Sequence, residues 1–278
     1  MQIKYAVLIL SLVLPVAFAN AMYLQIEGPI NATLQQNGAI NLGKIGPGES
    51  FYILASANTT NASGVLINKG WDTLEPVSLP AGWVAQASPL YENPMKIKIT
   101  TASFTPNGTY TMTIRAVNVG NYSKLGNLTI TAYINVSTNV FTASVSPTNL
   151  TVGVGQPGDL NITINNTGAS DDPFLINVTG LPAWNNPVEV IAPHDKVSHF
   201  IYQVSSNEPG QYPFNVTINS TTSALLHTTF KIRLAVQESV LSDYNATGQG
   251  LLLSPVIYEP VYALMQFLNY VYNLIAGV

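Results

Sequence analysis

The chain has 278 residues, a formal net charge of −4 and no cysteine; apolar residues make up 47% of it and charged residues only 9%. This balance excludes a nucleic-acid-binding protein, which needs a basic face, and a fold held together by disulfides. It provides enough apolar residues for two domain cores, and a neutral polar surface that changes little in an acidic medium.

Residues 1–21 predict a signal peptide. Lys4 gives the positive start, residues 5–14 form an apolar run, and small residues suited to cleavage follow. A retained anchor helix is the alternative, but a run of about ten apolar residues is too short to cross a hydrocarbon core about 30 Å thick. We therefore expect the mature chain to begin near Asn20 or Met22.

The body of the chain, from residue 22 to residue 237, has the pattern of half-buried strands. Apolar and polar residues alternate over residues 128–136, 160–165 and 214–219. Gly, Pro, Asn and Asp interrupt this pattern at spacings near ten residues, and no useful helical periodicity occurs before residue 255. The sequence predicts an all-β fold.

One order of motifs occurs twice in this body: a Pro/Gly turn, a strand, a Leu-Pro motif ending in Trp, a strand, a Gly-x-Tyr motif and a closing strand. About seven short strands in roughly 100 residues fit an immunoglobulin-like sandwich. We predict two tandem immunoglobulin-like β-sandwich domains, at residues 22–138 and 139–237, with a short joint near Ser137–Pro147 that limits bending.

The second copy contains Asn-Val-Thr-Gly-Leu-Pro-Ala-Trp at residues 177–184, Glu-Pro-Gly-Gln-Tyr at residues 208–212 and a closing Val/Thr/Ile strand. This order resembles the NEW3 and CARDB-type immunoglobulin-like modules of archaeal and bacterial surface proteins. The resemblance covers residues 139–237, and residues 30–137 more loosely, where an insert at Thr59–Gly70 and an extra glycine depart from the pattern. It implies a sandwich architecture and a cell-surface setting, without a common chemistry.

After the second copy we expect a linker at residues 238–254 and a hydrophobic helix at residues 255–278. No charge occurs from Val261 to Val278, and eighteen helical residues at about 1.5 Å each are barely enough to cross a bilayer. A polar stripe runs along one face of this helix, formed by Glu259, Gln266, Asn269 and Asn273.

Three interpretations of this helix stay open. We favour a membrane anchor that self-associates through its amide stripe. An interfacial helix usually carries Lys or Arg on its polar face, and this one has none. A helix that docks on a partner protein is the third. No Lys or Arg follows the segment, so the positive-inside rule does not orient it.

The chain contains fourteen Asn-x-Ser/Thr sequons, the acceptors of N-glycosylation. Their asparagines are Asn31, Asn58, Asn61, Asn107, Asn121, Asn127, Asn135, Asn149, Asn161, Asn165, Asn177, Asn215, Asn219 and Asn245. Polar positions of strands explain some of them without any glycan: Asn127, Asn135, Asn161, Asn177, Asn215 and Asn219. Asn31, Asn58, Asn61, Asn107, Asn121 and Asn245 lie in turn-like or linker stretches, where this explanation fails.

Sites for catalysis or cofactors are not evident, and we expect a non-enzymatic protein without a cofactor or a metal. His194, His199 and His227 lack metal-ligand spacing. Asp171 and Asp172, near Asn165 and Asn166, could offer oxygens to Ca²⁺, but a solvated turn is the simpler interpretation. A sugar-binding platform of tryptophans would use Trp71, Trp83 and Trp184, although the repeat gives Trp83 and Trp184 a structural role.

These features indicate a glycosylated structural protein on the extracellular face of the cell membrane or in the cell envelope, with an archaeal S-layer as its setting. Its expected partners are the membrane, through the C-terminal helix, and copies of itself or an S-layer protein. The layout is similar to a membrane-anchored S-layer stalk subunit but lacks a coiled coil before the anchor. A glycan- or protein-binding adhesin and a pilus or thread subunit are the alternatives.

Overall fold

The computed structural model describes residues 22–60, 66–120, 125–181, 186–238 and 268. The predicted signal peptide, the linker beyond residue 238 and the C-terminal helix, apart from Leu268, lie outside these residues. Within the described part of the chain, no helix has the length and apolar character that crossing a membrane requires. Strands form nearly all of the regular structure there, so the all-β prediction is confirmed.

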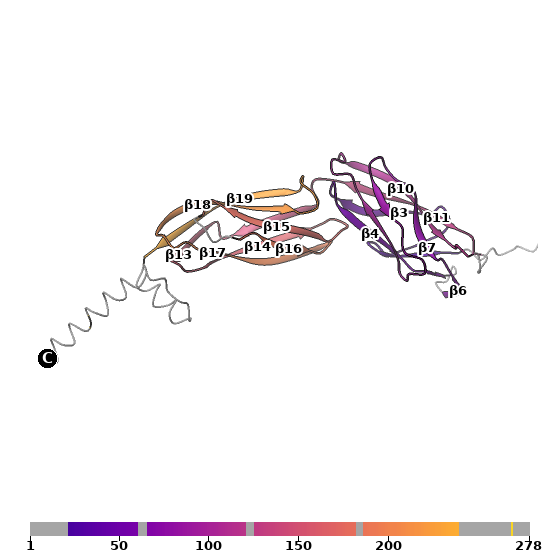
Figure 1. Cartoon of the computed structure of the whole chain (residues 1–278), viewed down its shortest axis with the longest axis horizontal. Helices are drawn as coiled ribbons and strands as arrows, with labels where there is room; N and C mark the ends of the chain where they lie inside the picture. Colours follow the sequence, from indigo (N-terminus) through magenta and orange to yellow (C-terminus); the bar gives the residue numbers. More distant parts are fainter. Residues whose placement is uncertain (1–21, 61–65, 121–124, 182–185, 239–267, 269–278) are drawn as a thin grey trace, which may run out of the picture.

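The first half of the chain forms a sandwich of two sheets (Figure 1). One sheet has the strand order β2-β1-β4-β9-β8 and the other β3-β11-β10-β7, while the insert forms a separate hairpin of β5 and β6. Its strands are β1 (Leu24–Gly28), β2 (Ala32–Leu34), β3 (Ala39–Ile45), β4 (Ser50–Ala55), β5 (Asn58–Thr60), β6 (Leu66–Gly70), β7 (Thr73–Ser78), β8 (Val84–Gln86), β9 (Met95–Thr100), β10 (Gly108–Val117) and β11 (Leu128–Val136).

The second half forms a second sandwich. Its sheets have the strand orders β12-β14-β17 and β13-β19-β18-β15-β16. Its strands are β12 (Phe141–Ser146), β13 (Asn149–Gly153), β14 (Gly158–Asn166), β15 (Asp172–Thr179), β16 (Val188–Ala192), β17 (Lys196–Val204), β18 (Gly210–Ser220) and β19 (His227–Gln237). β12 occupies most of the interval in which the sequence suggests a joint.

The strand order in both halves is that of an immunoglobulin-like sandwich. In the order of the sheets, β1, β4, β9 and β8 take the places of strands A, B, E and D, and β7, β10 and β11 those of C, F and G. In the second sandwich β12, β14 and β17 take A, B and E, and β15, β18 and β19 take C, F and G. In both, an early strand runs parallel to the last one: β3 to β11, and β13 to β19.

The Gly-x-Tyr motif predicted from the repeat forms a tyrosine corner in each sandwich. The hydroxyl of Tyr110 donates to the carbonyl of Pro106 at 3.0 Å, and the hydroxyl of Tyr212 donates to the carbonyl of Glu208 at 3.1 Å. Both bonds return to the residue four positions earlier, at the start of the F-like strand, as in the immunoglobulin fold. The two halves therefore share one local device at one place in the fold.

Each sandwich has its own hydrophobic core. The first is built from residues between Leu24 and Val136 and the second from residues between Val140 and Val236. The alternation of buried and exposed residues along β4, β9, β11 and β14 places one face of each strand in its core. The two cores are separate, so each sandwich is a structural unit.

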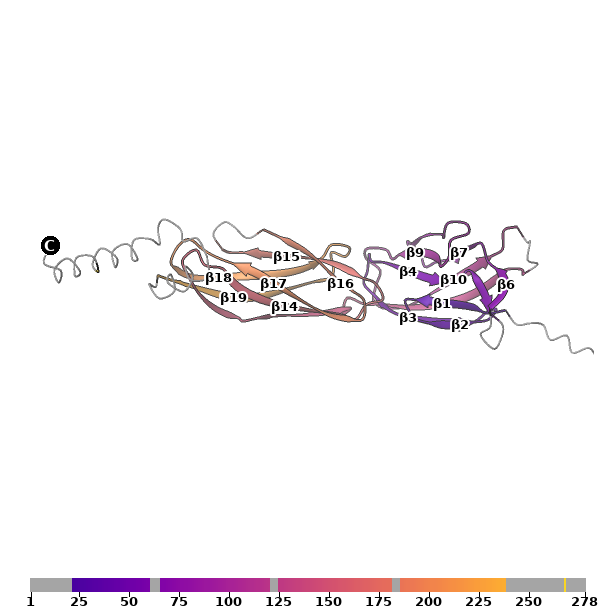
Figure 2. The same ribbon diagram turned by 90° about the horizontal axis from the view of Figure 1, so that it is seen from below.

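The two sandwiches lie end to end along the long axis of the molecule, and both views agree on this arrangement (Figure 1, Figure 2). The end of β3 and the turn between β3 and β4 meet the turn between β14 and β15, the start of β15 and the turn between β18 and β19. We call this contact region the junction. There the amide of Ala169 donates to the carbonyl of Lys44 at 2.7 Å.

Candidate functional site

The sequon asparagines lie on the surface of both sandwiches. Asn61, Asn121 and Asn245 are outside the described residues, and the remaining eleven are exposed or half-buried. Eight are exposed: Asn31, Asn58, Asn107, Asn127, Asn135, Asn149, Asn161 and Asn215. The other three, Asn165, Asn177 and Asn219, are half-buried. None of the eleven has the buried amide that would prevent attachment of a sugar.

The strand and turn positions of these asparagines differ in part from the prediction. Asn31 and Asn107 lie outside the strands. Asn127, expected at a strand position, lies just before β11, and Asn58, expected in a turn, begins β5. The sheet β2-β1-β4-β9-β8 has no sequon asparagine on its strands. Sugars would therefore leave one broad face of the first sandwich uncovered.

Two sequons on β14 lie beside exposed aliphatic side chains. In the antiparallel register Asn161 is opposite Ile201 and Asn165 is opposite Val197. Ile201 is 67% exposed and Val197 is 55% exposed, on the edge strand β17. Each of these two cross-strand pairs therefore places an asparagine of β14 beside an exposed aliphatic side chain of β17 on the outer face of the sheet.

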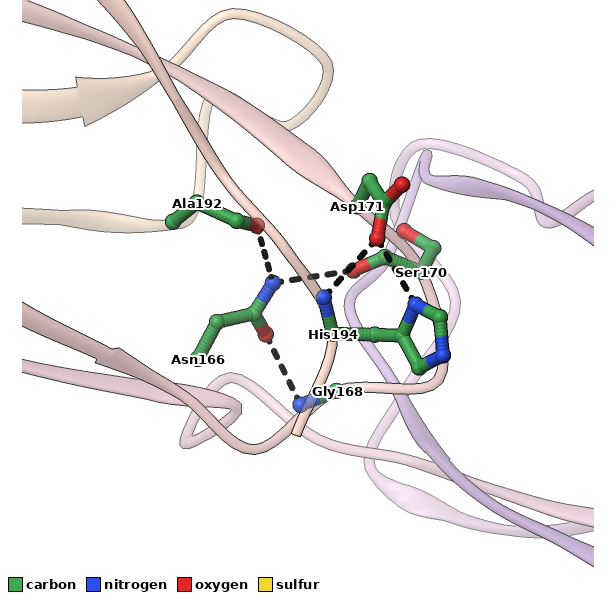
Figure 3. Close-up of polar contacts among 6 residues, drawn as sticks. All are labelled: Asn166, Gly168, Ser170, Asp171, Ala192 and His194. Atoms are coloured by element: carbon green, nitrogen blue, oxygen red, sulfur yellow. Dashed lines mark hydrogen bonds and ion pairs between the residues drawn. The ribbon is translucent and has the colours of Figure 1, made fainter. Parts of the chain in front are cut away.

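Asn166, next to the sequon asparagine Asn165, has the opposite environment. It is 2% exposed, and its amide nitrogen donates to the carbonyls of Ser170 and Ala192, each at 2.9 Å (Figure 3). Its amide oxygen accepts from the backbone of Gly168 at 2.8 Å. The side chain closes the turn between β14 and β15 from inside, and Asn166 is the middle residue of the Asn165 sequon but not an acceptor itself.

The adjacent acids Asp171 and Asp172 point to opposite sides, because successive residues of an extended chain do so. Asp171 is exposed and accepts from the backbone amide of His194 at 2.8 Å and from its ring at 2.7 Å (Figure 3). Partial burial by itself would raise the pKa of Asp171. The hydrogen bonds from His194 outweigh this effect, so the pKa is lowered. Its partner is therefore His194, and it shares no oxygen cluster with Asp172.

Asp172 corrects the sequence-based interpretation of this pair as a solvated turn or a calcium loop. It is 2% exposed, and its Oδ1 accepts from the hydroxyls of Ser220 and Thr222, each at 2.9 Å. Burial raises its pKa, although these two hydrogen bonds act against the shift. The second buried acid of the junction is Glu49, also 2% exposed, from the turn before β4.

The tryptophan platform is wrong for the two tryptophans that the structure describes. Trp71 and Trp83 are both buried in the first core. The ring of Trp83 packs against Tyr110 of the tyrosine corner, with centroids 5.4 Å apart. The Leu-Pro-Ala-Gly-Trp loop therefore closes the end of the sandwich, and the predicted structural role of Trp83 is supported. Trp184 lies outside the described residues.

The three histidines lie apart. His199 is bonded to Thr163 at 3.1 Å, His194 to Asp171, and His227 begins β19. In the described ranges no three His, Asp or Glu side chains come together as a metal site would require. A groove of about 300 Å³ at the junction is lined from both domains by Tyr52, Lys96, Asp171 and His194, among others. Its mixed charges favour no single class of ligand.

No family model matches the chain, and no curated protein matches it. Among solved structures, a chimeric titin Z1Z2 carrying a decorin peptide is similar over 78% of this chain and 98% of its own, at 13% identity and a TM-score of 0.34. Domains 4 and 5 of the S-layer protein SbsC are similar over 77% and 96%, at 16% identity and a TM-score of 0.29. The D00-D0 domain of Intimin is similar over 76% and 99%, at 12% identity and a TM-score of 0.26.

A β-glucosidase from Listeria innocua is similar over 34% of this chain, at 15% identity and a TM-score of 0.25, and the chain spans 16% of the length of that enzyme. At these identities and scores no function transfers from these proteins. The sandwich fold rests instead on strand order, register and the two tyrosine corners. The resemblance to NEW3 and CARDB-type modules stays a prediction.

Proposed function

We propose that the chain is a non-enzymatic, N-glycosylated structural protein of the cell envelope, associated with an archaeal S-layer. Its sandwiches stand on the outer side of the membrane, and residues 255–278 hold them there. One observation carries this proposal. All eleven described sequon asparagines reach solvent, and they are distributed over two sandwiches joined end to end.

In a sandwich rich in Asn and Thr, the alternation of side chains along a strand already points many asparagines toward solvent. The sequons in turns are therefore stronger support for glycosylation than those on strands. Asn31 and Asn107 are exposed in turn-like stretches, where no strand alternation was expected to direct them. The buried Asn166 is the middle residue of the Asn165 sequon and is not itself an acceptor. Every acceptor asparagine in the part of the chain that the structure describes is therefore exposed or half-buried.

Sugars on β14 would also protect the exposed aliphatic side chains of β17. Ile201 and Val197 lie directly opposite Asn161 and Asn165, within the reach of a sugar attached to either asparagine. Exposed apolar groups on a free strand edge favour association between chains. Glycans there would keep this edge solvated.

The glycan part of the proposal is tested by the intact mass of the native protein. We expect a mass above that of the polypeptide from residue 20 onward, with a loss of one glycan on Asn107→Gln and another on Asn161→Gln. Asn139→Gln is the matched control, because Asn139 is exposed but lies outside a sequon, and it should leave the glycan mass unchanged. A native mass equal to the bare polypeptide would overturn glycosylation.

The structural part is tested on native envelopes. We expect the protein to stay with membranes during a sodium carbonate wash, and negative-stain images to show it in a regular surface layer. Release by carbonate would contradict the membrane anchor. Linear polymers in the images would contradict the layer and favour a thread subunit, with the C-terminal segment held in a neighbouring copy.

A second candidate, a binding module that adds a partner strand, is favoured by two free edges of the second sandwich. β16 and β17 end their sheets and expose Val188, Ile191, Val197 and Ile201. An adhesin of this kind would bind its partner through the backbone of β17. Loss of that binding on Ile201→Pro, with the sandwich intact by circular dichroism, would favour it over the structural role.

A further inference from the structure

The junction brings two buried carboxyl groups together from different domains. Glu49 precedes β4 in the first sandwich, and Asp172 begins β15 in the second. The surrounding contact is tight, because a Cβ on Gly46 would lie only 2.5 Å from Cδ1 of Leu226 in the opposite domain. Little room for water remains beside the two acids, each 2% exposed.

Two of the carboxyl oxygens of this pair, one on each acid, accept hydrogen bonds from neighbouring groups. Glu49 Oε2 accepts from the backbone amide of Gly46 at 2.6 Å, and Asp172 Oδ1 accepts from the hydroxyls of Ser220 and Thr222. Asp172 Oδ2 is buried and has no donor among the described residues, while the carboxyl of Glu49 lies near enough to Asp172 for each to influence the pKa of the other. A proton on one of the two acids would supply the missing donor. Two carboxylates are both acceptors, so a hydrogen bond between them needs a proton.

The neighbouring donors indicate which acid holds this proton. Asp172 already accepts two hydroxyl hydrogens, an arrangement that stabilises its charged form. Glu49 then acts as the donor. Burial, followed by the charge of Asp172, raises the pKa of Glu49 to about 8.

The other titratable groups of the elements that meet here leave this pairing undisturbed. The side chains of Asp171 and His194 are hydrogen-bonded to each other, and the positive charge of Lys196 helps to lower the pKa of Asp171. Lys44 takes part through its backbone carbonyl, and Lys96 lies over the ring of Tyr52, 4.1 Å from its centroid. Among the charges that the structure describes, that of Asp172 is the one that raises the pKa of Glu49.

We propose that Glu49 and Asp172 form a proton-dependent latch between the two domains. With one proton shared, the pair is a short-range bond across the junction. When this proton leaves, two negative charges face each other without solvent or a cation, and the domains separate so that water can reach them. The chain is then a stiff rod in acid and a hinged pair of domains in alkali.

The direction of the pH effect follows from linkage. A carboxyl whose pKa is higher in the joined state than in the open state favours joining in acid, and the joined state loses this advantage as the pH rises from the ordinary glutamate value of 4.5 to about 8. For a single proton the ratio of joined to open molecules falls by up to about tenfold per pH unit in this window. Above this window the proton is absent from both states, so the ratio no longer changes with pH through this pair.

The absence of cysteine makes a direct test possible. Spin labels at Gln86→Cys and Ser144→Cys, both exposed and in different domains, report the distance distribution across the junction in the full chain in detergent. EDTA is present throughout, so that divalent cations do not bridge the acids. We expect a narrow distribution at pH 5, a broad one at pH 9 and return of the narrow one on reacidification.

Three variants separate the latch from other causes. Glu49→Gln keeps the acceptor for Gly46 and a donor toward Asp172, and should give a narrow distribution at both pH values. Asp171→Asn removes a neighbouring exposed charge and should respond as the parent does. Gly46→Val wedges against Leu226 and should broaden the distribution at both pH values, which shows that the labels detect an open junction.

Either of two results would overturn the latch. One is a parent distribution that stays narrow from pH 5 to pH 9 while Gly46→Val is broad. The other is a Glu49→Gln chain that opens at pH 9 as the parent does. Asp172→Asn gives an independent check, because its amide can donate to an ionised Glu49, and it too should remain closed at pH 9.

Discussion

Replacing Phe174 with alanine is expected to lower the free energy of unfolding of the second sandwich by about 3–5 kcal/mol. Phe174 is fully buried in β15, and its ring packs against Phe141 of β12 with centroids 4.7 Å apart. β12 and β15 belong to different sheets, so this pair joins the two layers of the core. A cavity here removes contacts from both layers at once.

Hydrogen exchange of the full chain in a urea series measures this loss, because it separates the amides of β14 and β18 from those of the first sandwich. Phe174→Leu keeps most of the volume and should cost less than about 1.5 kcal/mol. Phe104→Ala is the surface control, since Phe104 is 81% exposed, and it should stay within about 0.5 kcal/mol of the parent. A Phe174→Ala loss as small as that of Phe104→Ala would contradict the core described above.

Strand alternation allowed much of the sandwich fold to be predicted, because one buried face leaves a period of two in the sequence. The run at residues 128–136 is β11, and the Gly-x-Tyr motif is a tyrosine corner in both halves. The small hairpin of β5 and β6, which interrupts the repeat, was visible in the sequence only as an insert.

The junction was missed, although strand phase contains a signal for it. Asn166 continues the inward phase of Leu160, Ile162 and Ile164 in β14, and Asp172 has the phase of Phe174 and Ile176 in β15. Glu49 likewise shares the phase of Phe51 and Ile53. In this chain, three polar residues in the inward phase at strand ends lie near the junction.

The pairing of Glu49 with Asp172 could not be derived from the sequence. The two residues belong to different domains, and their contact depends on the angle at which the sandwiches meet. Similarly, the burial of Trp71 depends on tertiary packing and not on its neighbours in the chain. Residue type suggested a sugar platform there, whereas packing places the ring in the core.

Replacing Asn166 with alanine is expected to lower the free energy of unfolding of the second sandwich by about 2–5 kcal/mol. The substitution leaves the carbonyls of Ser170 and Ala192 and the amide of Gly168 without their partner (Figure 3). Each buried polar group that loses its hydrogen bond costs about 1–3 kcal/mol, and relaxation of the turn recovers part of the sum. The carbonyl of Ala192 belongs to β16, so the loss loosens β16 as well as the turn after β14.

Asn166→Asp distinguishes these hydrogen bonds from the mere volume of the side chain. It keeps the acceptor for Gly168 but places a carboxylate oxygen against the two carbonyls, so its pKa should rise and the variant should be less stable at pH 7 than at pH 4. Asn165→Ala, one residue earlier and half-buried on the outer face, is the matched control and should cost less than about 1 kcal/mol. If Asn166→Ala and Asn166→Asp have equal, pH-independent stabilities close to that of Asn165→Ala, then Asn166 does not hold the junction end of the second sandwich. The large loss expected instead would mean that this polar cluster is as necessary to the domain as its apolar core.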